Sequence, residues 1–104
     1  MQIELYIDGE KKIFTVPYAP QLAKRKYLEI MVKAEEREGI PTAKEQLEEE
    51  DALYSILADV VFKSQFTINE LYEGASHKYN ESKLAEAVFG VKPKENSEGN
   101  VKGE

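Results

Sequence analysis

The first sixteen residues alternate between apolar and polar side chains in the pattern of a β-hairpin. Every second residue from Ile3 to Ile7 is apolar, and residues 13–16 are β-branched or aromatic. Such period-two alternation is typical of a strand that buries one face. An Asp-Gly pair at positions 8 and 9 is a turn signal. The pattern therefore predicts a hairpin over residues 2–16.

Two pairings of these strands are open. A four-residue turn at positions 8–11 sets Leu5 beside Phe14, so that two apolar side chains share one face. A two-residue turn at Asp8-Gly9 instead opposes Leu5 with Lys12, which wastes the apolar face. We therefore expect the four-residue turn.

Four later segments carry apolar residues at helical spacing, which is the pattern of helices with one buried face. A hairpin alone is only marginally stable, so it must pack on these helices. We expect an α+β fold, in which an N-terminal β-hairpin packs on a small bundle of three to four helices in one globular domain, residues 1–90. The predicted helices cover about residues 20–38, 43–64, 68–73 and 77–89.

The end of the chain has a different composition. Residues 91–104 are almost entirely Lys, Pro, Glu, Asn, Ser and Gly. Such residues bury too little apolar area to offset the entropy cost of ordering the chain. The sequence predicts a disordered polar tail, and we expect deletion of residues 92–104 to leave the stability of the domain unchanged.

The clearest helix boundary begins at Phe66, in the segment Phe-Thr-Ile-Asn-Glu-Leu-Tyr-Glu-Gly. Thr67 and Glu70 have the spacing of a capping box, in which each side chain accepts from the other residue's backbone N–H. Phe66 and Leu71 are placed to form a hydrophobic staple. Gly74 offers a left-handed residue to end the helix. These features predict a short helix and no chemistry.

Some apolar residues do not fit the core face of their helices. Leu28 and Val32 are neighbours four residues apart on the outward side of the first long helix, and Phe62 projects opposite the core side of the second. Two explanations are open. Either other parts of the chain cover these residues, with the last helix over Leu28 and Val32 and with Phe66 and Tyr72 over Phe62, or the residues form a surface that binds a partner and favours a homo-oligomer. The candidate partner-binding residues are Leu28, Val32, Phe62, Phe66 and Tyr72.

The charge of the chain argues against nucleic acid as a partner. Twenty acidic and fourteen basic residues give 104 residues a net charge of −6. Binding to phosphate would need a concentrated basic patch, whereas Lys24, Arg25 and Lys26 spread around their helix. Eight acids in residues 35–51 indicate a solvated connector and an acidic helix start, or a guide for a basic partner segment.

Residues for catalysis, cofactors or metals are scarce. The chain has no cysteine, and its only histidine, His77, lies near a helix start beside Ser76. A metal site needs three or more good ligands, and the glycines occupy separate turns rather than one phosphate-binding loop. We expect no catalytic, cofactor-binding or metal residues, and hence no enzyme. The absence of a long apolar run and of a signal sequence predicts a soluble intracellular protein without a membrane partner.

The order of these features resembles a known family. An Ile-Asp-Gly hairpin, a Pro-containing helix entry and an acid-rich connector come first. A Val-Val-Phe helix end then runs into Phe-Thr-x-x-Glu-Leu-Tyr-x-Gly, and an amphipathic helix follows. Over residues 1–90 this order is similar to that of the tail assembly chaperones of long-tailed phages and prophages of Gram-positive bacteria.

The resemblance implies a non-enzymatic viral protein that binds the tape-measure protein, keeps it soluble and promotes assembly of the tail tube. It implies the tape-measure protein and the major tail protein as partners, and a longer form of the chain made by ribosomal frameshifting. It also implies action in the host bacterial cytoplasm and absence from the mature virion. Two alternatives stay open, a small structural or connector protein of the phage particle and an adaptor that binds a host protein.

Overall fold

The computed structural model describes residues 1–91, so the predicted tail lies, apart from its first residue, outside the described part of the chain. A two-stranded antiparallel hairpin precedes four helices, the second of which ends in a π-helical segment, η1. The predicted α+β class is confirmed. The elements are β1 (Gln2–Ile7), β2 (Glu10–Thr15), α1 (Gln21–Glu36), α2 (Ala43–Ser55), η1 (Ile56–Val61), α3 (Ile68–Gly74) and α4 (His77–Phe89).

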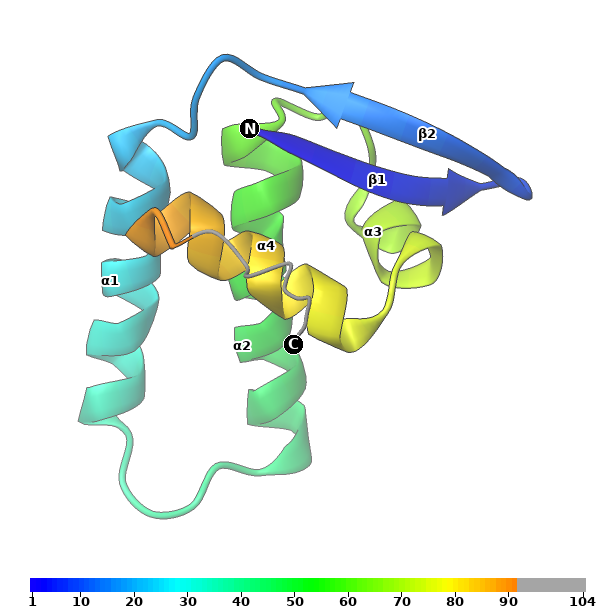
Figure 1. The fold of residues 1–104 in the computed structure, drawn as a ribbon. Coiled ribbons are helices and arrows are strands. Elements are labelled where there is room, and N and C mark those ends of the chain that lie inside the picture. Colours follow the sequence, from blue (N-terminus) through cyan, green and yellow to red (C-terminus); the bar gives the residue numbers. More distant parts are fainter. Residues whose placement is uncertain (92–104) are drawn as a thin grey trace, which may run out of the picture.

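The long helices and the hairpin form two layers. α1 and α2 run side by side and are joined by a loop at one end, while α4 crosses them and the hairpin lies over α3 at the other end (Figure 1). The hydroxyl of Tyr79 in α4 accepts a hydrogen bond of 2.9 Å from the backbone N–H of Glu4 in β1. This bond ties the last helix to the first strand. Within residues 1–91, the length and polarity of the helices rule out a membrane-spanning helix.

The core lies between the hairpin and the helices. Apolar side chains from both strand β1 and the helices meet there, and residues far apart in the sequence share it. The largest fully buried side chains are Ile3, Leu5, Leu57, Val61, Phe62 and Leu71.

The hairpin turn differs from our expectation. Asp8 and Gly9 form a two-residue turn with φ of 55° and 79°, and Leu5 is paired with Lys12. Positive φ at both turn residues is the geometry whose twist matches that of the two strands. Leu5 is fully buried in spite of its charged cross-strand partner because α3 packs on β1 at Gly74. The predicted four-residue turn is therefore wrong. We expected an apolar residue of β2 to lie beside Leu5, whereas α3 covers Leu5 instead.

The end of the second long helix also differs. The Phe62 N–H donates to the carbonyl of Leu57, five residues earlier, at 3.0 Å. This π-type bond adds a residue to the turn, so side chains no longer advance by the ~100° per residue of an α-helix. Phe62, the residue that ends this segment, is fully buried, so the exposed partner-binding position considered for it is wrong.

Local caps set the starts of the later helices. Thr67 and Glu70 form the predicted capping box, with bonds of 2.8 Å to the Thr67 N–H and 3.1 Å to the Glu70 N–H. Thr42 and Glu45 form a second box at the start of α2 that the sequence analysis did not identify. The predicted left-handed conformation of Gly74 is wrong, because Gly74 is the last helical residue of α3.

Candidate partner-binding surfaces

Two of the predicted partner-binding residues belong to the core. Phe62 and Phe66 are both buried, and their ring centroids lie 5.4 Å apart. Phe66 also packs on Phe14 of β2, at 5.1 Å between the ring centroids. Phe66 thus folds over Phe62, which was the structural alternative considered for these residues. Neither side chain is placed to contact a partner in this structure.

Tyr72 joins two helices, α3 and α2. Its ring packs edge-on against Tyr54 at 5.9 Å, and its hydroxyl donates to Asp51 Oδ1 at 2.8 Å. Burial, followed by the hydrogen bond to Asp51, raises the pKa of Tyr72 well above that of an ordinary tyrosine. Burial also raises the pKa of Tyr54, with smaller effects from Glu81 and Glu50. Tyr72 therefore holds α3 against α2 in the described structure.

Leu28 and Val32 lie where the sequence placed them. They are 48% and 52% exposed on α1, a helix that forms one edge of the molecule (Figure 1). Of the five predicted residues, these two alone share an exposed face. Their role in binding a partner stays a prediction.

The structure also contains a groove that sequence reasoning missed. Two hollows of about 240 and 510 Å³ lie between α1 and the α2–η1 helix, and they share Ile30, Lys33 and Ala52. The two hollows adjoin at these residues, and together they are called the α1–α2 groove below. Its apolar lining consists of Ile30, Ala34, Ala52, Ile56 and Val60.

The two walls of the α1–α2 groove differ in charge. Lys26 and Lys33 lie on the α1 wall, where Lys26 pairs with Glu29 at 3.7 Å. On the α2–η1 wall, Glu45, Glu48 and Asp59 lie along the groove. An ion pair of 3.2 Å between Arg37 and Glu49 lies at the loop end. An apolar floor between a partly basic and an acidic wall suits an amphipathic helix of complementary charge.

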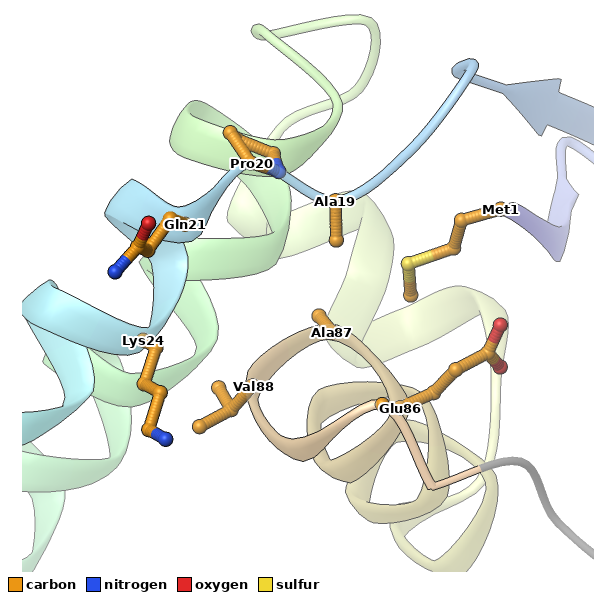
Figure 2. Close-up of a pocket in the computed structure, with 9 residues that line it drawn as sticks. Met1, Ala19, Pro20, Gln21, Lys24, Glu86, Ala87 and Val88 are labelled. Carbon is orange, nitrogen blue, oxygen red and sulfur yellow. The ribbon is translucent and has the colours of Figure 1, made fainter.

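A third hollow, of about 480 Å³, lies where the two ends of the described chain meet. Met1, the linker before α1 and the end of α4 surround it, with Lys24 and Glu86 at its sides (Figure 2). The Met1 ammonium donates to the Val16 carbonyl at 2.9 Å, and Glu86 pairs with Lys83 at 3.3 Å. The charged groups around this hollow thus bond to other residues of the chain, and the hollow lies where three segments of the chain meet.

Ser76 and His77 have structural roles at the start of α4. The Ser76 hydroxyl accepts from the Tyr79 N–H at 3.1 Å, so it is the N-cap of the helix. His77 is exposed and lies 3.6 Å from Glu81 on the next turn. Within residues 1–91 no three His, Asp or Glu side chains gather in a way that could hold a metal ion. The described residues do offer candidate binding surfaces, namely the hollows above and the exposed pair Leu28 and Val32.

Comparison with known proteins agrees with this emphasis on binding. A family model described as phage tail chaperone protein matches residues 1–104, which is the whole chain. Searches of curated proteins and of solved structures found no significant match. The resemblance stated above is thus confirmed at the level of the family. The chain belongs to the phage tail chaperone protein family.

Proposed function

We propose that this chain binds the tape-measure protein during phage assembly, keeps it soluble and promotes assembly of the tail tube around it. The observation that carries the proposal is the α1–α2 groove in a member of a tail chaperone family. A tape-measure protein is expected to be long and largely helical, so its apolar helix faces need cover before the tube encloses them. A groove for amphipathic helices supplies such cover.

The geometry of the α1–α2 groove supports a helical client. α1 has 16 residues and is about 24 Å long at about 1.5 Å per residue. A client helix along it would place apolar residues at i, i+3, i+4 and i+7 over Ile30, Ile56 and Val60. Acidic client residues would face Lys33, and basic ones would face Glu48. Because this pattern is loose, one groove suits many segments of a long client.

The same proposal includes where the chain acts and which other proteins it binds. The chaperone is non-enzymatic, acts in the cytoplasm of the bacterial host, and is absent from the mature virion. The major tail protein and a longer frameshifted form of the chain are further proposed partners, as is a second copy of the chain. The net charge of −6 favours protein partners over nucleic acid.

A matched pair of variants tests the groove. Ala52 lies where the two hollows meet, and it is exposed, so Ala52→Arg should fill the groove without disturbing the core. Leu47→Arg is the control, because Leu47 is an exposed apolar residue on the same helix outside the groove. Each chain is co-expressed with the tape-measure protein of its own phage, and soluble complex is measured by pull-down.

We expect the wild-type chain and Leu47→Arg to keep the tape-measure protein soluble, and Ala52→Arg to lose most of the complex. Circular dichroism confirms that both variants are folded. Normal binding by Ala52→Arg would move the site away from the groove. If the wild-type chain leaves the client insoluble, the chaperone function itself fails.

The composition of purified virions separates the chaperone from a connector protein. Mass spectrometry should detect the major tail protein and find this chain depleted relative to infected-cell lysate. A fixed number of copies per particle would support the structural alternative.

A further inference from the structure

The outer face of α1 has the sequence of a helix that pairs with another helix. Arg25, Leu28, Val32 and Glu35 follow one another at spacings of three, four and three residues. This is the spacing of the seam in a two-stranded coiled coil, and it places the four side chains within about 80° of the helix circumference. Leu28 and Val32 at the centre are half exposed, on a helix at the edge of the molecule (Figure 1).

Four charged residues at the ends of α1 are placed unfavourably for an isolated helix. Lys24 and Arg25 lie near its N-terminus, and Glu35 and Glu36 are its last two residues. The helix dipole favours acids at the N-terminus and bases at the C-terminus, an arrangement that Lys33 in the last turn follows and these four residues do not. None of these four residues makes an ion pair with another residue in the part of the chain that the structure describes. Their charges are available to a partner.

We propose that two copies of this chain pair through the outer faces of α1, with the two helices antiparallel. Three pairs of residues on this face are centred on position 30 of the sequence. They are Leu28 with Val32, Arg25 with Glu35, and Lys24 with Glu36. A two-fold axis at this position sets Leu28 of each copy against Val32 of the other. The basic pair of each copy then lies beside the acidic pair of the other, so the face is complementary to itself.

Two further exposed residues fit the same arrangement. Tyr18 and Ile40 are 71% and 92% exposed, and they lie just outside the two ends of α1. Antiparallel pairing brings the loop after one α1 beside the linker before the other. In this arrangement, Ile40 of one copy lies toward the same end of the helix pair as Tyr18 of the other.

The proposed interface is small. A helix of about 24 Å covers less surface than a standard protein interface, so we expect a dissociation constant in the micromolar range. Leu28 and Val32 do not line the α1–α2 groove, whereas Glu36 lines its loop end, so pairing leaves the part of the groove around Ile56 and Val60 accessible in both copies. Self-association is measured in the absence of the tape-measure protein. A negative result would therefore overturn the pairing without contradicting the proposed chaperone function.

Charge reversal tests the pairing. The Lys24→Glu/Arg25→Glu variant places acids at both ends of α1, and the Glu35→Lys/Glu36→Lys variant places bases at both ends. Analytical ultracentrifugation measures self-association of each variant and of their equimolar mixture. We expect at least tenfold weaker self-association for either variant alone and recovery in the mixture. Failure of the mixture to recover, or a wild-type chain that is monomeric at millimolar concentration, would overturn the proposal.

Cross-linking tests the direction, because the natural chain has no cysteine. Antiparallel pairing places Arg25 of one copy level with Glu35 of the other, and it separates the two copies of Arg25 by about 15 Å along the axis. A short bifunctional thiol reagent should therefore link Arg25→Cys to Glu35→Cys in a mixture, and link neither variant to itself. Efficient linking of Arg25→Cys to itself would mean parallel helices and would overturn the proposal.

Discussion

Gly74 lies directly against the backbone of Tyr6, where the last turn of α3 meets strand β1. A Cβ atom at position 74 would be 2.9 Å from the Tyr6 carbonyl oxygen and 3.1 Å from the Cβ of Leu5. Atoms at these separations overlap, so a side chain at this position would push the helix away from the strand. The glycine thus allows the close packing that buries Leu5.

Substitution of Gly74 should therefore destabilise the domain. We expect Gly74→Ala to lower the free energy of unfolding by about 1–3 kcal/mol, since the obstructing atoms belong to the strand backbone and cannot rotate away. Urea unfolding followed by circular dichroism measures the loss. Glu73→Ala, one residue earlier on the exposed side, is the control. Equal stability of Gly74→Ala and the wild type would contradict the packing argument.

The two capping boxes should contribute similar amounts to the free energy of unfolding. Thr67→Ala and Thr42→Ala each remove a side chain that accepts a backbone N–H bond of 3.1 Å, and each should cost about 1 kcal/mol. Glu70→Ala should show a smaller loss that is coupled to that of Thr67→Ala. Denaturant titration of the single and double variants measures the coupling. A Thr67→Ala chain of unchanged stability that no longer binds a partner would identify a recognition motif instead.

Aspartate substitutions at Phe62 and Leu28 should have opposite effects on folding. Phe62 is fully buried, so Phe62→Asp should cost about 3 kcal/mol or more, as expected for a charge forced into a core. Leu28 is exposed, so Leu28→Asp should change stability by less than about 0.5 kcal/mol. Thermal unfolding compares them, and light scattering should show weaker self-association for folded Leu28→Asp. Two equally stable variants would place Phe62 outside the core.

The contact between Tyr72 and Asp51 should make stability depend on alkaline pH. The raised pKa means that the folded state favours the protonated phenol. Its contribution is complete below about pH 10, the ordinary tyrosine value, and is lost as the pH rises toward the folded-state pKa. Tyr72→Phe should lose about 1 kcal/mol at neutral pH with its hydrogen bond to Asp51, and should show a shallower alkaline loss.

Urea unfolding at about pH 8 and about pH 10.5 compares the wild type with Tyr72→Phe across the range where tyrosine ionises. Asp51→Asn is the second control, because it keeps an acceptor for the hydroxyl and removes the charge that disfavours ionisation. The same alkaline loss in all three chains would show that other groups cause it.

The sequence by itself determined the kind and the order of the elements. The hairpin, the four helices and the capping box at Thr67 all appear where alternation, helical spacing and cap residues predicted them. Each of these signals is an interaction between residues close in the sequence, so no knowledge of the fold is needed to read it. The order of the same signals also carried the family resemblance that the family model confirms over the whole chain.

Only the tertiary structure decided how the faces of these elements are used. Leu5 is covered by α3. Phe62 is buried at the end of η1, where Phe66 packs on it. The α1–α2 groove joins residues such as Lys33 and Ala52, which meet only when the helices pack. Packing between distant segments sets burial and shape, and those interactions leave no periodic signal within a single element of the sequence.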